Sequence, residues 1–147
     1  MDFTTTFSLK PPKRVGRHIL TKCGFDKVNY LVRDGINKGR INLSEKTKRS
    51  YELVLAQNSL SMTTNDVLIW ASQQKFEKTR FIDAFTFAAQ YPDVQKDGPI
   101  IFLQEAPYFW SGYSFYLMLG YTDLGRVVTF VSGGGIWSSR YRFAFLG

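Results

Sequence analysis

Hydrophobic residues alternate with other residues along the last third of the chain, in the period of two that is typical of β-strands. Turn residues separate four segments that share this pattern: 100–104, 108–121, 126–131 and 136–146. Strand segments at this spacing predict an antiparallel meander or a sandwich-like arrangement. We therefore expect an α+β protein that is mainly β, with an antiparallel, strand-rich C-terminal half and one or two helices.

Two earlier segments, 41–43 and 51–55, also alternate, and the polar sequence EKTKR lies between them. This pattern predicts a β-hairpin with a charged, exposed tip. The stretch 64–91 fits two interpretations. It contains neither glycine nor proline, polar residues that can cap a helix stand at its start, and Pro92 would end the helix. The segment 81–87 also alternates as a strand does; we favour a helix, and the strand stays open.

Three consecutive glycines, at 133–135, follow one predicted strand and precede another. A phosphate-binding loop would normally add a lysine or lead into a helix, but IWSSRYRFAF is a poor start for a helix. We therefore interpret the glycines as a tight hairpin turn, which needs the positive φ angles that glycine adopts freely. Anion binding through Arg140 and Arg142, on the polar side of the last strand, is the minor alternative.

The segment 108–121 carries large apolar residues on both of its sides. A strand of this kind is either central and covered on both faces by its own chain, or it takes part of its cover from another subunit. Both interpretations stay open. If a subunit interface exists, we expect it to use aromatic and apolar residues of the last third, namely Trp110, Tyr116, Met118, Trp137 and Tyr141.

The length of 147 residues predicts one domain, and the net charge of +7 is concentrated in the first third of the chain. Residues 1–50 have a net charge of +8, residues 51–97 of −2 and residues 98–147 of +1. We expect a basic extended arm at 1–18, followed by a single β-rich domain at 19–147. Clustered cations of this kind attract a nucleic-acid backbone. The candidate residues for binding anions or nucleic acid are Lys10, Lys13, Arg14, Arg17, Lys22, Lys46, Lys48 and Arg49.

Several kinds of chemistry are disfavoured by the composition. With a single cysteine, Cys23, and a single histidine, His18, the chain can form no internal disulfide, and its ligand set predicts no metal site. We expect no cofactor, and the sequence identifies no small-molecule substrate. Ribonuclease chemistry needs only a general base or acid and cations. His18, Glu45 or Glu52, together with Arg14, Arg17 or Arg49, would supply groups of those types.

We expect a non-enzymatic structural protein that assembles through aromatic β-surfaces, as in a viral or phage particle, with the basic segment contacting a neighbour or packaged nucleic acid. A nucleic-acid-binding accessory or regulatory protein is the alternative, and a ribonuclease-like enzyme or toxin is the third. No signal peptide and no apolar stretch of membrane-spanning length is found in the sequence. The expected location is therefore the virion or the cytoplasm, without membrane association.

Overall fold

The computed structural model describes residues 1–13, 16–45, 49–105 and 107–147. Within these ranges the helices are α1 (His18–Cys23), α2 (Tyr30–Asn37), α3 (Thr64–Gln73), α4 (Phe81–Gln90) and the 3₁₀-helix η1 (Val94–Asp97). The strands are β1 (Phe3–Leu9), β2 (Lys27–Val28), β3 (Tyr51–Gln57), β4 (Met62–Thr63), β5 (Ile100–Phe102), β6 (Tyr108–Trp110), β7 (Tyr113–Thr122), β8 (Gly125–Ser132), β9 (Ile136–Trp137) and β10 (Arg142–Leu146). No helix of the described chain has both the length and the apolar character needed to cross a membrane.

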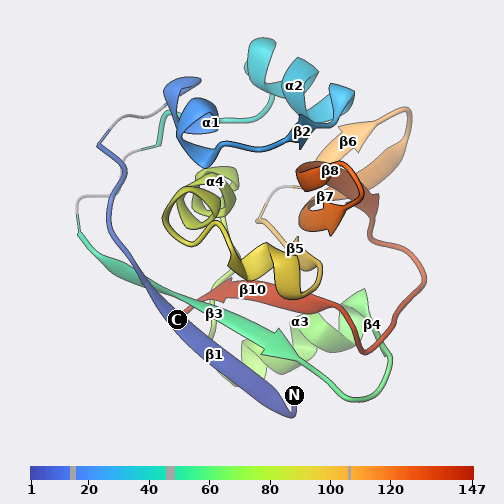
Figure 1. Ribbon diagram of the computed structural model, residues 1–147. Coiled ribbons are helices and arrows are strands. Elements are labelled where there is room, and N and C mark those ends of the chain that lie inside the picture. The colour runs from blue at the N-terminus through green and yellow to red at the C-terminus, as the bar shows by residue number, and fades with distance from the viewer. Residues whose placement is uncertain (14–15, 46–48, 106) are drawn as a thin grey trace.

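One mixed sheet organises the molecule (Figure 1), with the strand order β1-β3-β10-β5-β7-β8-β2 and β6 beside β7. The pairs β10–β5 and β2–β8 are parallel, and the other pairs are antiparallel. The predicted class, α+β and mainly β, is confirmed. The order differs from a simple meander because the last strand, β10, lies between β3 and β5 instead of beside β8.

The sheet has a hydrophobic cluster on each face. Helices α1, α2 and α4 contribute Ile19, Val32 and Phe85 to the first cluster, where they pack with sheet residues such as Leu117 and Leu119. The second cluster joins α3 to the opposite face of the sheet, through residues that include Val67, Ala71, Ile101, Trp137 and Phe143. The alternation in the sequence thus arises because successive residues of a strand enter different clusters.

The segment 108–121 forms a hairpin, β6 and β7, instead of a single strand. Strand β7 is central, between β8 on one side and β5 and β6 on the other. Its residues Leu117 and Leu119 belong to the first cluster, whereas Tyr116 and Met118 pack against the second. At this level of β7, residues of the chain itself therefore pack on both faces of the strand, with α4 on one face and the second cluster on the other.

The helical interpretation of 64–91 is confirmed, with two helices in place of one. Thr63 caps α3: its Oγ1 accepts a hydrogen bond from the backbone N–H of Asp66, and the carboxylate of Asp66 accepts one from the N–H of Thr63. The helix α4 is almost entirely buried. The segment 81–87, whose alternation also fitted a strand, lies within this helix.

The hairpin predicted for 41–55 is wrong. Ile41 and Leu43 are buried in the first cluster but form no strand, and β3 pairs with β1 and β10. The alternation of these two residues therefore reflects burial of two side chains of an irregular segment. Lys46 and Lys48, in the predicted hairpin tip, lie outside the described residues.

The glycines at 133–135 do not close a hairpin, so that prediction is also wrong. They lead from β8 into β9, which pairs with β4 in a separate two-stranded sheet. Gly133 lies against the ring of Tyr116, which a Cβ atom at this position would overlap, and Gly135 has a φ of 89°. The close approach of Gly133 to Tyr116 and the left-handed backbone of Gly135 thus explain two of the three glycines.

Residues 3–9, within the predicted basic arm, form β1 and pair with β3 over the full length of both strands. The two residues that follow Lys10, Pro11 and Pro12, are partly buried. The helix α1, which begins at His18, packs on α4. The described part of 1–18 is therefore joined to the same sheet and core as the residues that follow it.

Candidate functional site

A groove of about 800 Å³ lies between the end of β1, α1 and the C-terminal half of α4. Its volume is in the range of about 300–1,000 Å³ that ligand sites usually occupy. Two neighbouring segments of the sequence, 8–13 and 19–22, and a distant one, 86–91, form its walls. The residues that line it are Ser8, Lys10, Pro11, Pro12, Lys13, Ile19, Lys22, Thr86, Ala89, Gln90 and Tyr91. No acidic residue is among them.

The groove exists because the C-terminal end of α4 binds the backbone that leaves β1. The side-chain amide of Gln90 accepts a hydrogen bond from Lys10 N (2.9 Å) and donates one to Lys10 O (2.7 Å). The hydroxyl of Tyr91 donates to Ser8 O (2.7 Å). The two prolines after Lys10 restrict the backbone further, because each fixes its own φ. The chain is thereby held at a fixed place across α4.

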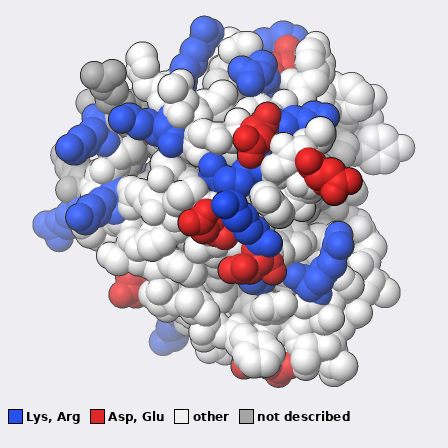
Figure 2. All heavy atoms as spheres, in the orientation of Figure 1, with Lys and Arg blue, Asp and Glu red and all other residues white. Residues whose placement is uncertain are grey.

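Lys10, Lys13 and Lys22 give the groove its charge. All three are exposed, and none takes part in an ion pair found among the described residues. Figure 2 shows Lys and Arg side chains gathered on the left of this face, whereas most acidic side chains in the view lie nearer its centre and right. The three ammonium groups are therefore available to an anionic partner.

The floor of the groove is apolar. Among its aliphatic residues, Ile19 of α1 is buried and Ala89 of α4 is partly exposed. The ring of Tyr91 is held in place by Phe7, with the ring centroids 5.0 Å apart, and by Phe87, at 5.6 Å. A partner with anionic groups on one side and flat apolar groups on the other would meet complementary chemistry here.

Two of the other predicted cations, Arg17 and Arg49, do not line this groove. Arg17 is exposed and lines a smaller hollow of about 260 Å³ together with residues from 36 to 44. Arg49 is exposed, just before β3. Arg14, Lys46 and Lys48 lie outside the described residues, so nothing is assigned to them. Of the eight cations predicted from the sequence, the described structure places three around one groove.

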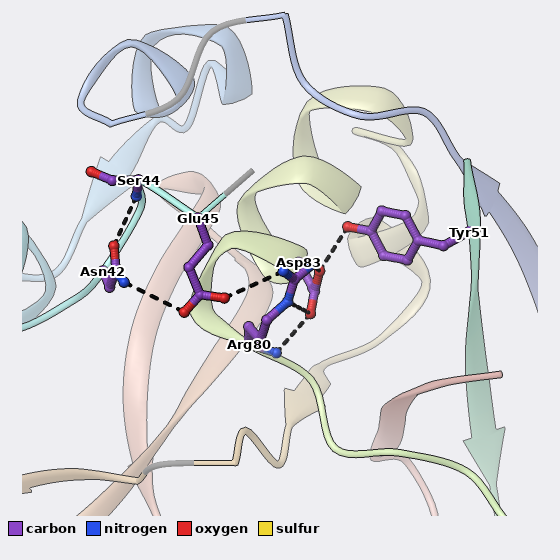
Figure 3. A network of polar contacts seen from close by, with 6 residues as sticks. All are labelled: Asn42, Ser44, Glu45, Tyr51, Arg80 and Asp83. Carbon is purple, nitrogen blue, oxygen red and sulfur yellow. Dashed lines mark hydrogen bonds and ion pairs between the residues drawn. The ribbon is translucent and has the colours of Figure 1, made fainter. Parts of the chain in front are cut away.

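A second group of polar residues surrounds the N-terminal end of α4 (Figure 3). The carboxylate of the buried Asp83 accepts hydrogen bonds from Arg80 N (2.7 Å), from Arg80 Nη2 (2.8 Å) and from the hydroxyl of Tyr51 (2.7 Å). Arg80 also pairs with Glu45, with 3.3 Å between Nη1 and Oε2. These bonds join β3 and the 42–45 segment to the start of α4.

The electrostatics of this network favour a structural role. Burial, with the charge of Asp83 adding to it, raises the pKa of Tyr51 above its usual value. The hydrogen bond to Asp83 likewise raises the pKa of Arg80. A phenol and a guanidinium that keep their protons are poor general bases at neutral pH. Because Asp83 is fully buried and accepts several bonds, the network holds α4 in place.

Among the described residues, no hydrogen bond or ion pair joins the residues proposed for ribonuclease chemistry to one another. His18 is exposed at the start of α1, and no hydrogen bond joins it to a carboxylate within the described chain. Glu45 is engaged by Arg80. Cys23 is buried, and its thiol donates to Phe85 O at 3.1 Å. Across the described ranges, no group of three or more potential metal ligands is found.

The five predicted interface residues differ in exposure. Trp110 is 47% exposed, near the tip of the β6–β7 hairpin. Tyr116, Met118 and Tyr141 are partly buried and pack against the second cluster. Trp137 is buried within its own chain, and its indole N–H donates to Thr64 Oγ1 at 2.8 Å. Of the five, Trp110 has the largest exposed surface for a partner.

Sequence reasoning missed the residues that α4 contributes to the groove, above all Gln90 and Tyr91. Their local pattern indicated only a helix end before Pro92, and nothing local connects that end to residues 8–10. Comparison with known proteins adds no assignment: no family model, no curated protein and no solved structure matches the chain.

Proposed function

We propose that this protein binds single-stranded nucleic acid in the groove between β1, α1 and α4, without catalysing a reaction. The observation that carries the proposal is the placement of Lys10, Lys13 and Lys22 around one largely apolar groove that no acidic residue of the described chain lines. Clustered lysines release counterions from a phosphate backbone, so they supply affinity that does not depend on base sequence.

The form of the groove supports a single strand over a duplex. Bases that are free of a partner strand can rest on apolar and aromatic surface while their phosphates meet cations. Ala89 and Tyr91, which are partly exposed, supply such a surface in the groove that the lysines line. A duplex presents its phosphates on a convex exterior and keeps its bases stacked inside, so it would leave this floor unused. We propose that such a protein acts where nucleic acid is accessible, either in the cytoplasm or inside a virion.

The test is fluorescence anisotropy of a labelled oligothymidylate of about 12 nucleotides, a length within the range of sites on small domains. Affinity should fall steeply with salt. Replacing Lys10, Lys13 and Lys22 together by alanine should lower the slope of log K against log salt by about 2, since each phosphate contact contributes about 0.7 for single strands.

A matched control replaces Lys27, Lys38 and Lys78, which are exposed and do not line the groove, by alanine. Both triple variants lower the net charge from +7 to +4. Only the groove variant should bind the oligonucleotide more weakly and show a smaller slope of log K against log salt. Equal losses in the two variants would show that net charge alone attracts the strand, and an unchanged groove variant would refute the proposal.

A second candidate function is that of a self-assembling structural protein, as in a viral or phage particle. The observation that favours it is the β6–β7 hairpin, where Phe109 is 64% and Tyr113 is 67% exposed beside Trp110. Exposed aromatic clusters are typical of protein contacts. Light scattering should then report a mass that rises with concentration, and Trp110→Glu should abolish the rise. A mass that does not depend on Trp110 would contradict assembly through this hairpin.

A further inference from the structure

Strand β1 is the terminal strand of the sheet, and one of its two edges is not paired with another strand of the described chain. Its sequence, FTTTFSL, contains no charge, no glycine and no proline over Phe3–Leu9. Proteins usually protect an edge strand with charged residues, prolines or bulges, because the unpaired backbone groups are a template for another strand. None of these devices is present within β1.

The hydrogen bonds around β1 identify the backbone groups that point outward. Ser8 O accepts from Tyr91, and both backbone groups of Lys10 are bonded to Gln90. Because backbone direction alternates along an antiparallel strand, the residues at even positions face away from β3. The outward groups of Thr4 and Thr6 lie beyond the end that α4 covers. Figure 1 shows β1 at the rim of the sheet.

We propose that the free edge of β1 pairs in antiparallel fashion with β1 of a second copy of this chain, around a two-fold axis at Thr5. This register places the outward backbone groups of Thr4 opposite those of Thr6 of the second copy. Two symmetric sets of backbone hydrogen bonds form, and the sheets of the two copies become continuous. The proposal does not depend on what occupies the groove.

The side chains of β1 complement themselves in this register. Phe7 packs on the first cluster, where its ring contacts Phe87 and Tyr91. Phe3 is on the same face of the strand and is 63% exposed. In the proposed pair, Phe3 lies opposite Phe7 of the second copy. The most exposed apolar residue of the strand is thereby covered by an aromatic cross-strand pair.

Charge at the two ends of β1 selects the antiparallel direction. Asp2 precedes the strand and Lys10 follows it. In the proposed register Asp2 lies opposite Ser8 of the second copy, and Lys10 of that copy is its diagonal neighbour on the same face, which a long side chain can reach. A parallel pair would place Asp2 of one copy near Asp2 of the other, and Lys10 near Lys10. Charge complementarity therefore favours a two-fold pair of identical strands.

The first test is light scattering after size exclusion, with an expected mass of twice the 16.9 kDa of one chain. Thr6→Pro removes an outward N–H while the bonds of β1 to β3 remain, and Thr6→Lys places a charge on the edge. Each should raise the dimer dissociation constant by about tenfold or more. The control Gln73→Lys adds the same charge at an exposed site on α3 and should leave the mass unchanged.

A charge exchange tests the register. Asp2→Lys and Lys10→Asp should each weaken the dimer, and the double variant should restore it, because the pairing partners are exchanged between copies. The bonds of Asp2 to Ser59 are not restored in the double variant, so a recovered dimer reports the contact between subunits alone.

Amide hydrogen exchange supplies a residue-level result. The N–H groups of Thr4 and Thr6 should become protected as concentration rises, whereas those of Thr5 and Phe7, which face β3, should be protected at every concentration. A monomeric mass at all concentrations, or a dimer that Thr6→Pro and Thr6→Lys leave intact, would overturn the proposal.

Discussion

The guanidinium of Arg126, on β8, joins the C-terminal ends of two helices. Nη1 donates to Cys23 O (2.6 Å) at the end of α1, and Nη2 donates to Ala88 O (3.1 Å) in the last turn of α4 and to the side-chain oxygen of Gln95 (3.2 Å). Carbonyl groups at a helix end have no partner within the helix, and they carry its negative dipole. Because α1 and α4 also line the groove, Arg126 fixes the relative position of two of its walls.

Replacing Arg126 by methionine retains much of the side-chain volume but leaves three buried acceptors without this donor. Each unsatisfied acceptor destabilises the folded state by about 1–3 kcal/mol, which gives roughly 3–9 kcal/mol before any compensation. Methionine avoids burying a charged group, which offsets several kcal/mol of that loss. We therefore expect the free energy of unfolding to fall by about 3–5 kcal/mol, a large part of the usual total of about 5–15 kcal/mol.

Urea denaturation followed by tryptophan fluorescence measures this change. With a slope of about 1–3 kcal/mol per molar, the midpoint should fall by about 1–5 M. The control Arg33→Met, at an exposed position on α2, should change stability by no more than about 0.5 kcal/mol. A loss below about 1 kcal/mol for Arg126→Met would refute the reasoning, since the desolvation of the guanidinium would then cancel its hydrogen bonds.

Three further predictions concern single residues. Gly133→Ala should lower the free energy of unfolding by about 1–3 kcal/mol, because its methyl group overlaps the ring of Tyr116; an unchanged Tm would show that the ring moves aside. Burial raises the pKa of the Cys23 thiol from 9.0 to about 12, so the stability linked to the protonated thiol is complete below pH 9 and is lost between pH 9 and 12. Cys23→Ala should lack this alkaline component in denaturation measured across that range, and identical pH curves would contradict it. Asp83→Asn should lower the pKa of Tyr51, because a neighbouring negative charge is removed, and an ultraviolet titration of the phenol that stays unchanged would exclude this coupling.

Local patterns predicted what local physics controls. The alternation at 100–104 and 126–131 indicated strands because successive side chains of a strand point to opposite faces, and β5 and β8 are found there. Capping residues and the absence of glycine and proline indicated helix at 64–91, where α3 and α4 lie. The same reasoning failed at 41–55. Ile41 and Leu43 are buried residues of an irregular segment, and their spacing of two only resembles that of a strand.

The candidate site, too, was predictable where it depends on local sequence and not where it depends on distant contacts. Lys10, Lys13 and Lys22 were identifiable because they are close together in the sequence and charge is a property of composition. The groove that they share could not be identified from the sequence, because its other wall comes from Gln90 and Tyr91. The hydrogen bond between Gln90 and Lys10 joins residues 80 positions apart. No local pattern encodes a contact at that separation.

The sequence by itself determined the class of the fold, the concentration of positive charge in the first third and the two-sided apolar character of 108–121. Only the tertiary structure decided which strands are neighbours, that both faces of β7 join hydrophobic clusters of its own chain, and that the outer edge of β1 is paired with no other strand among the described residues. The physical reason is that side-chain alternation and charge are set by nearest neighbours along the chain. Strand order depends instead on how distant segments share the burial of one core.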